Sequence, residues 1–536
     1  MLRFETSFKE KFTPFVRVYD TDLKKSVKIE IPNQYEYYKP FSKGTYSYVN
    51  DKSLKLEKYL GTAKDARDNY GVFNPIDRYV RDNFWQTGYN ENPRIFYLDI
   101  ETRSAGSFPL PELAEQEITL IQVYDNFTGC MYVLGLRDYY QEPGYECEFP
   151  VKYLKFDTEY DLLDAYLKIF ERLDPLIIYA WNGDNFDYPY IYNRLKNVGL
   201  DTQRLSNYGT VKLETGENFG QTTFDFSSHG HYYLDLMKVY KKFAFRNLAS
   251  YSLNSVSEAE LNDKKIEHNE FVTFDSFYTG KDYEISETPY DDPVREEIRQ
   301  LKIAEHNGKP FDNQRLQNLM QFQFVWYGIK DVYLLKKIDD KINLTSIMIS
   351  IAQTMGCSFS EAMATVRPWS CGLQNIYYKE NLVCPPREEH ETPNVVGGFV
   401  REPNTGIHRW LMNFDVNSMY PMLSIAGHNM SPETFIPKSR LAPDLREHIL
   451  MYFNDQNESK LLDYPEEVWT KTKELLKKYN VSLGINGAVY SNDTLGIIPK
   501  TVKEIYFGRK ADKKKMLRYE QQSEIIKEIL KKRATV

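Results

Sequence analysis

The sequence predicts a mixed α and β protein of several domains, with α+β and α/β segments following one another. Its 536 residues are enough for several domains of ordinary size. Hydrophobic residues make up 42% of the chain and aromatic residues 15%, which supplies a large core and argues against disorder. Short alternating strands are expected in residues 1–93 and apolar strands with amphipathic helices in 94–344. One long helix is expected over 498–532.

Charge and cysteine content narrow the class of protein. The net charge is −8, but residues 500–536 carry 12 Lys and Arg against 5 Asp and Glu, so a basic end adjoins an acidic body. This distribution indicates one anion-binding element and acidic clusters of the kind that bind metals. None of the five cysteines forms a Cys-x-x-Cys pair, which predicts reduced thiols and no zinc site.

The sequence also indicates where in the cell the protein is expected. No apolar run approaches the roughly 18 residues of a membrane helix, and the N-terminus carries no signal-peptide core. We therefore expect a cytoplasmic protein without a membrane partner.

The first hairpin offers a candidate metal site that we interpret differently. Residues 15–19 and 27–31 alternate with period two, and Asp20 and Asp22 lie in the turn between them. A solvated turn explains this pair better than a metal site, because two lysines follow at once and no acidic partner is evident.

Two carboxylates lie on the apolar strand expected at residues 94–102. Asp99 and Glu101 are two residues apart, so they project from one face of that strand. Two like charges on a mostly buried strand are costly unless a cation pairs with them. An antiparallel partner strand is expected at 118–124.

Further carboxylates follow in other elements. Asp187 comes after the buried strand 176–180 and a polar turn, where the helix 188–198 begins. Asp235 ends another apolar segment; a structural role, as a helix cap or sheet-edge carboxylate, and a functional role both stay open. Residues 263–315 are expected to form a loop-rich insertion, and the helix expected over 316–340 carries a further polar pair.

That pair is Tyr327 and Asp331, which share one helix face because they are four residues apart. With Asp99, Glu101 and Asp187 they complete a set of four carboxylates and one phenol. Such a set fits a two-metal phosphodiesterase site, in which Tyr327 orients the attacking water. Mg²⁺ suits an all-oxygen site of this kind.

The C-terminal third has its own candidate site. Residues 410–415 are apolar as in a buried strand, and Asp415 stands where that strand ends. A carboxylate there suits a divalent cation, and the backbone amides of the following turn suit phosphate oxygens. A strand followed by an ordinary turn is the alternative. Helices are expected at 343–355 and 466–479, and a hairpin at 486–494.

These motifs resemble those of family B DNA polymerases. Residues 96–102 and 181–187, together with Tyr327 and Asp331, resemble the three exonuclease motifs of that family. Residues 414–421 resemble its polymerase motif A, and 508–513 the start of its fingers motif. All five occur in the family's order.

Three connecting segments are similar to the replicative polymerases of T-even-type bacteriophages in particular, namely residues 240–243, 250–253 and 431–434. The resemblance implies four parts. They are an N-terminal domain (1–93, with a return segment 345–386), an RNase H-like 3′→5′ exonuclease domain (94–344), a partial palm with motif A (387–495) and an incomplete first fingers helix (496–536).

The resemblance also implies roles for the matching residues. Two metal ions per site, Mg²⁺ or alternatively Mn²⁺, are expected on the carboxylates of each centre. The expected roles in the polymerase centre are metal binding by Asp415 and the Val416 carbonyl, nucleotide binding by Ser418, Met419, Tyr420, Arg509 and Lys513, and exclusion of a 2′-hydroxyl by Tyr420. The resemblance also implies DNA binding by two pairs of residues. Asn182 and Phe186 would hold the single-stranded 3′ end, and Gly397 and Gly398 would contact DNA from the segment that joins the exonuclease domain to the palm.

The sequence departs from the family pattern in two ways. Val395 replaces the tyrosine of the joining segment, so primer transfer is expected to be tuned differently. The second fingers helix, the second palm carboxylate pair, the thumb and the clamp-binding tail are not found. The basic helix at 498–532 is otherwise open to interpretation as a solvated charged helix.

We therefore predict the N-terminal subunit of a split phage replicative polymerase in the host cytoplasm. A separate C-terminal chain would supply the rest of the fingers, palm and thumb. A sliding clamp would bind through that chain. Its other expected partners are primer–template DNA and deoxynucleoside triphosphates. The alternatives are a stand-alone 3′→5′ exonuclease and a truncated DNA-binding product without turnover.

Overall fold

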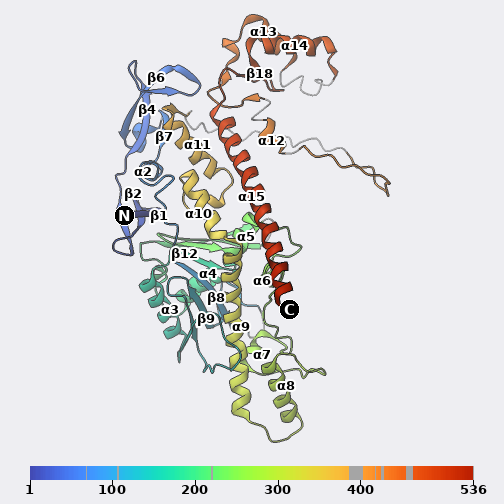
Figure 1. The fold of residues 1–536 in the computed structure, drawn as a ribbon. Coiled ribbons are helices and arrows are strands. Elements are labelled where there is room, and N and C mark those ends of the chain that lie inside the picture. Colours follow the sequence, from blue (N-terminus) through green and yellow to red (C-terminus); the bar gives the residue numbers. More distant parts are fainter. Residues whose placement is uncertain are drawn as a thin grey trace. The chain divides into compact units, whose positions relative to one another are not determined.

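The computed structural model describes residues 1–536 except for 68, 105–107, 219–220, 245, 385–401, 417, 424–427, 454–462 and 535–536 (Figure 1). The chain folds into two compact units. Unit 1 contains Met1–Gln34 and Asn74–Gly372, and unit 2 contains Tyr35–Phe73 and Leu373–Val536. Both units combine strands with helices, which confirms the mixed multidomain class. The division into four parts stays a prediction.

A six-stranded mixed sheet forms the centre of unit 1, in the order β11-β10-β9-β8-β12-β15. β9 is antiparallel to β8 and β10, whereas β12 is parallel to β8 and β15. Every residue of β9 is buried, and so is all of β8 except Asp99. The strands are β8 (Ile95–Thr102), β9 (Ile118–Asp125), β10 (Cys130–Gly135), β11 (Val151–Lys155), β12 (Ile177–Ala180) and β15 (Tyr232–Asp235).

Helices cover both faces of this sheet, which is why its inner strands β8, β9, β10 and β12 form nearly continuous apolar runs in the sequence. Phe96, Leu98 and Ile100 of β8 enter one core together with α3 and α4. Ile95 and Tyr97 enter the other core together with α9. The helices near the sheet are α3 (Glu159–Leu173), α4 (Asp187–Asn197), α5 (Leu236–Phe243), α6 (Leu253–Leu261), α9 (Asn313–Ile342) and α10 (Leu344–Met355).

The remaining elements of unit 1 include the predicted N-terminal hairpin, extended by one strand. They are β1 (Leu2–Glu10), β2 (Thr13–Asp20), β3 (Lys25–Glu30), α2 (Pro75–Asn83), β13 (Val211–Asn218), β14 (Gln221–Ser228), α7 (Phe274–Thr279) and α8 (Pro293–His306). The expectation of a loop-rich segment over 263–315 was wrong for α7 and α8. α7 is too short to show helical periodicity, and it forms because Thr273 caps it and Phe277 is buried.

Unit 2 contains two smaller sheets, ordered β16-β5-β6-β4-β7 and β17-β19-β18. The first is built from β4 (Tyr35–Pro40), β5 (Tyr46–Tyr48), β6 (Asp51–Gly61), β7 (Tyr70–Phe73) and β16 (Leu382–Val383). The second is built from β17 (Phe435–Ile436), β18 (Val481–Leu483) and β19 (Val489–Ser491). The helices are α1 (Ala63–Ala66), α12 (Met419–Met422), α13 (Pro443–Tyr452), α14 (Glu466–Tyr479) and α15 (Ile497–Ala534); α11 (Arg367–Lys379) is divided between the units.

Residues 410–415, predicted to be a buried strand, are irregular and exposed. The side chains of Trp410, Leu411 and Phe414 are 97%, 84% and 85% exposed. No strand among the described residues pairs with this stretch. An apolar sequence forms a strand only where a neighbouring strand completes its hydrogen bonds and a core covers its side chains. The described part of the chain provides neither.

Two expectations about the whole chain can be compared with the structure. All five cysteines are free thiols, as predicted. Among the helices that the structure describes, none combines the length and the apolar content that crossing a bilayer requires.

A buried arginine joins the N-terminal strands to the central sheet. Arg17 on β2 is 1% exposed, and its Nε donates to the Glu5 carboxylate at 2.8 Å. Its guanidinium also donates to the carbonyls of Gly230 at 2.7 Å and Asp174 at 2.9 Å, which lie next to β15 and β12. A charge this deeply buried is tolerated because each donor has a partner.

We expect Arg17→Ala to lower the free energy of unfolding of unit 1 by about 3–5 kcal/mol, because Glu5 would remain buried without its partner. Thermal or urea unfolding monitored by circular dichroism would measure the loss. Arg172→Ala, which removes an exposed arginine from α3, is the matched control and is expected to leave the transition nearly unchanged. Equal effects of the two substitutions would contradict this account.

Candidate active site

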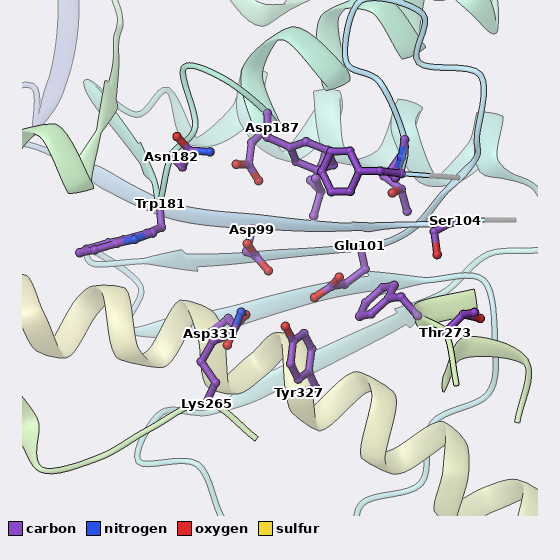
Figure 2. Close-up of a pocket in the computed structure, with 16 residues that line it drawn as sticks. Asp99, Glu101, Ser104, Trp181, Asn182, Asp187, Lys265, Thr273, Tyr327 and Asp331 are labelled. Carbon is purple, nitrogen blue, oxygen red and sulfur yellow. The ribbon is translucent and has the colours of Figure 1, made fainter. Parts of the chain in front are cut away.

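A pocket of about 630 Å³ in unit 1 collects side chains from several elements (Figure 2). It lies beside β8, an inner strand of the central sheet, and is open to solvent. Among the residues that line it are all seven for which the sequence predicted an exonuclease role: Asp99, Glu101, Asn182, Phe186, Asp187, Tyr327 and Asp331.

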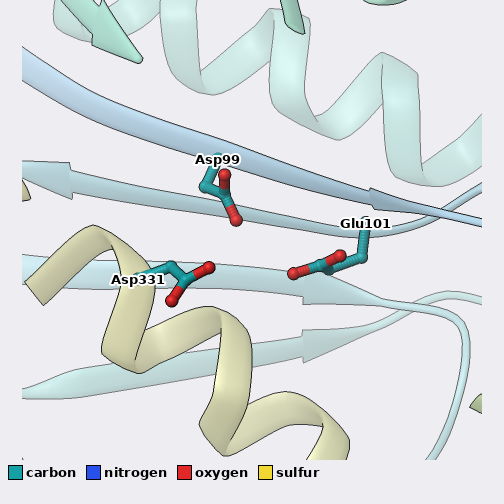
Figure 3. A group of neighbouring side chains, drawn as sticks. All are labelled: Asp99, Glu101 and Asp331. Atoms are coloured by element: carbon teal, nitrogen blue, oxygen red, sulfur yellow. The ribbon is translucent and has the colours of Figure 1, made fainter. Parts of the chain in front are cut away.

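Three carboxylates form the floor of the pocket. Asp99 and Glu101 project from β8, and Asp331 projects from α9 towards them (Figure 3). One oxygen of each lies within 4.8 Å of the others. Asp331 Oδ1 is buried and has no hydrogen-bond partner among the described residues. An all-oxygen set with an unsatisfied buried acceptor fits Mg²⁺, which prefers carboxylate oxygens and water.

Asp187 faces the same pocket from another element. It is the first residue of α4 and follows the polar turn after β12, as the sequence predicted. Burial raises the pKa of Asp187 to about 7, and the Asp235 carboxylate contributes to that rise. Asp187 lies outside the group of three carboxylates but lines the same pocket.

Burial dominates the electrostatics of the cluster. It raises the pKa values of Asp99 and Glu101 well above their ordinary range, and the neighbouring carboxylates add to that shift. Burial also raises the pKa of Asp331, against the opposing effect of Lys265. In the absence of a cation the cluster therefore retains its protons to a higher pH than ordinary carboxylates do.

Lys265 is a site residue that the sequence did not indicate. Its ammonium forms an ion pair with Asp331 and lies 4.8 Å from the centre of the Tyr327 ring. Burial opposes its charge, but Asp331 and Tyr327 more than compensate, so the pKa of Lys265 is raised. Lys265 lies in the segment predicted to be loop-rich, where no periodicity or motif distinguishes one lysine from its neighbours.

Tyr327 is held in place by aromatic packing. Its ring makes edge-on contacts with His268, Phe274 and Phe277. Burial and the Asp331 carboxylate raise the pKa of its phenol, so the hydroxyl stays protonated and can donate a hydrogen bond. Tyr327 and Asp331 both line the pocket, as their spacing of four predicted.

Asn182 and Phe186 form the opposite wall. Asn182 adopts a left-handed conformation (φ 63°), and its backbone N–H donates to Asp235 Oδ1 at 2.9 Å. The same oxygen accepts the N–H of Met237 and caps α5. Asp235 is thus a helix cap, which is the structural role that the sequence left open beside a functional one, and it also fixes the Asn182 turn. The centre of the Phe186 ring lies 5.7 Å from the centre of the Phe108 ring, which gives the pocket an aromatic side.

The residues for which the sequence predicted a polymerase role belong to unit 2 and are distant in sequence from this cluster. Asp415 and Val416 belong to the exposed irregular stretch, and Ser418 adopts a left-handed conformation just before α12. Tyr420 is 80% exposed. Met419 begins α12, and α12 contacts α15, the helix that carries Arg509 and Lys513. Gly397 and Gly398, like Val395, lie outside the described residues.

Comparison with known proteins places both regions in one family. The model of the exonuclease domain of DNA polymerase family B matches residues 72–256, and the model of DNA polymerase family B matches residues 364–536. The chain is 27% identical to the DNA-directed DNA polymerase of Escherichia phage RB69 over 520 residues, which are 92% of this chain and 50% of that protein.

Two further relatives agree with this result. The DNA-directed DNA polymerase of Enterobacteria phage T4 is 29% identical over 463 residues, 82% of this chain and 44% of that protein. DNA polymerase 1 of Pyrococcus abyssi is 24% identical over 286 residues, 52% of this chain and 31% of that protein. The chain thus spans about half the length of the phage polymerases that it matches.

We expect Mg²⁺ to stabilise the protein at about pH 8 and to have little effect at about pH 5.5. Because the folded-state pKa of Asp187 is raised to about 7, its contribution to stability is present at low pH and lost as the pH rises through 7. Mg²⁺ binds only the deprotonated carboxylates, so it replaces the lost protons at high pH.

Thermal unfolding with and without Mg²⁺ at the two pH values would measure this effect. Asp99→Asn combined with Glu101→Gln keeps the shape of the cluster and is expected to abolish the Mg²⁺ effect. An equal response to Mg²⁺ at both pH values, or in that variant, would contradict the assignment.

Proposed function

Because the chain belongs to DNA polymerase family B, we propose that unit 1 is a 3′→5′ exonuclease that shortens single-stranded DNA. The observation that carries this proposal is the convergence of Asp99, Glu101 and Asp331 with Tyr327 in one open pocket. These residues come from a strand and a helix that are distant in sequence. The arrangement fits hydrolysis of a phosphodiester at the end of a flexible strand.

The carboxylates would hold two Mg²⁺ ions, or Mn²⁺ as an alternative. Asp99, Glu101 and Asp331 provide one compact oxygen set, and Asp187 extends it towards the Asn182 wall. When bound, such cations supply an activated water and stabilise the charge on the leaving oxygen.

The other pocket residues would orient the reactants. The Tyr327 hydroxyl, kept protonated by burial, would hold the attacking water by a hydrogen bond. Lys265 offsets part of the negative charge around Asp331. Asn182 and Phe186 would hold the 3′-terminal nucleotide, with the Phe186 ring stacking against its base, which tolerates any sequence.

Unit 2 would contribute nucleotide-binding residues to a polymerase centre. Asp415 and the Val416 carbonyl would bind the catalytic metals, and the Ser418 and Met419 amides would meet the triphosphate. Tyr420 would pack under the sugar and select deoxynucleotides. Arg509 and Lys513 are four residues apart on α15 and would bind phosphate oxygens as charged donors. Gly397 and Gly398 would approach the DNA backbone.

We further propose that a separate C-terminal chain completes the fingers, palm and thumb and connects the assembly to a sliding clamp. This proposal is supported by the exposure of apolar side chains in two places that polymerase function needs, around Trp410–Phe414 and along α15 at Ile525, Ile526, Ile529 and Leu530. Primer–template DNA and deoxynucleoside triphosphates would be the substrates of the completed assembly. The similarity to phage enzymes supports a location in the cytoplasm of an infected bacterium.

Asp99→Ala combined with Glu101→Ala is expected to reduce digestion of a 5′-labelled single-stranded oligonucleotide by at least about a thousand-fold, because the several kcal/mol that metal ions supply would be lost. Gel electrophoresis would follow the shortening from the 3′ end. Asp20→Ala with Asp22→Ala removes two carboxylates with the same spacing from an exposed turn and is the matched control. Undiminished digestion by the first variant would refute the site, and a wild-type chain without nuclease activity would favour a non-catalytic DNA-binding role.

Primer extension is expected only when this chain is mixed with the completing chain. In the mixture, Asp415→Ala is expected to abolish extension while digestion of single strands continues, because the two centres use different carboxylates. Asp463→Ala, which removes an exposed carboxylate of unit 2, is the control. Extension by the Asp415→Ala mixture would contradict the role of Asp415. If no candidate chain restores extension, a stand-alone exonuclease is favoured.

A further inference from the structure

A buried glutamine contacts a helical glycine behind the carboxylate cluster. Gln122 on β9 is 0% exposed, and neither its amide nitrogen nor its amide oxygen has a hydrogen-bond partner among the described residues. A Cβ atom added to Gly328 on α9 would lie 1.7 Å from Gln122 Nε2. No side chain larger than hydrogen fits at Gly328 while the amide keeps this position.

The register of the sheet places this contact next to the site. Gln122 is paired with Asp99 across the β8–β9 ladder, and Leu120 is paired with Glu101. Residues directly opposite each other in an antiparallel pair project to the same face. Gln122 therefore shares the face of β8 and β9 from which Asp99 and Glu101 reach α9.

The helix supplies the other half of the contact. Gly328 directly follows Tyr327 and precedes Asp331 by three residues, so it lies within one turn of both site residues of α9. The glutamine amide thus lies against the helix backbone at Gly328, within one turn of the residues that carry the phenol and the carboxylate of the pocket. α9 packs on both β8 and β9, and at this point Gln122 and Leu120 lie against it.

Both partners of the contact are costly to the fold. A buried amide without partners has lost its hydrogen bonds to water, and a glycine inside a helix lowers helix stability relative to alanine. Ordinary packing would avoid both costs with an apolar side chain on the strand and an alanine on the helix. Their combination beside the cluster indicates that the approach of α9 to the sheet matters more here than local stability.

We propose that Gln122 and Gly328 are positioning residues for the exonuclease, acting as a spacer that sets the distance between Asp331 on α9 and the carboxylates of β8. This inference rests on the proposed exonuclease function and deepens it. The amide defines how closely the helix backbone can approach, and Gly328 makes that approach possible. Neither residue lines the pocket, so both act through Tyr327 and Asp331.

A four-member cycle tests the spacer: wild type, Gly328→Ala, Gln122→Ala and the double variant. For each, the maximal exonuclease rate and the Mg²⁺ concentration that gives half of that rate would be measured, alongside thermal unfolding. Gly328→Ala in the presence of Gln122 is expected to lower the maximal rate by about a hundred-fold, since a displacement near 1 Å can have that effect, and to raise the Mg²⁺ requirement. In the Gln122→Ala background the same change is expected to have little effect, because the shorter alanine side chain does not reach the helix.

The outcomes separate this inference from simpler ones. The spacer proposal is overturned if Gly328→Ala lowers the maximal rate equally in both backgrounds or in neither. A loss of thermal stability with an unchanged Mg²⁺ requirement indicates packing alone and also overturns it. If Gly328→Ala does not fold, the spacer predicts that the double variant folds and digests DNA, and a double variant that fails too refutes the proposal.

Two controls complete the experiment. Gln317→Ala removes an exposed glutamine from α9 and is expected to match wild type in all three measurements. A wild-type chain without Mg²⁺-dependent digestion refutes the proposed function and this inference together. An active wild type with no coupling between positions 122 and 328 refutes this inference alone.

Discussion

The repulsion among buried and half-buried carboxylates is the constraint on which unit 1 depends. Asp99, Glu101 and Asp331 approach one another within 4.8 Å, and among the described residues that line the pocket Lys265 is the only basic side chain. Burial weakens the hydration that would otherwise stabilise their charges, so their pKa values rise. The fold tolerates this arrangement because β8 is fixed on both faces by packed cores and α9 is anchored along the sheet. A divalent cation would convert the repulsion into attraction.

The two candidate centres differ in how completely the described fold organises them. The candidate exonuclease carboxylates and Tyr327 lie on a strand and two helices. Contacts fix the orientation of the site, such as the hydrogen bond from the Asn182 backbone to Asp235 and the aromatic packing around Tyr327. The motif A residues around Asp415 lie in an irregular, exposed stretch. A site of the first kind is ready to receive substrate, whereas one of the second kind needs further chain to cover it. This contrast is what the proposal of a completing chain explains.

The sequence predicted those parts of the fold whose patterns are local. The helix at 466–479 was predicted at the bounds that α14 has, and the period of two at Asp99 and Glu101 placed both carboxylates on one face. Convergence of these residues with Asp187 and Asp331 followed from chemistry and family resemblance. The strand predicted at 410–415 was wrong because an apolar run specifies a strand only together with its neighbours. Lys265 was missed because its role arises from a tertiary contact with Asp331 that no local pattern encodes.

The central claim is that divalent cations belong among these carboxylates. It is tested most directly by a crystal structure with Mn²⁺ and a hydrolysis-resistant single-stranded oligonucleotide, using anomalous scattering to locate the metal. The account predicts a Mn²⁺ peak at bonding distance from oxygens of Asp99 and Glu101, with the 3′-terminal nucleotide between Phe186 and Tyr327. Mn²⁺ bound only elsewhere, or a 3′ end seated outside this pocket, would contradict it.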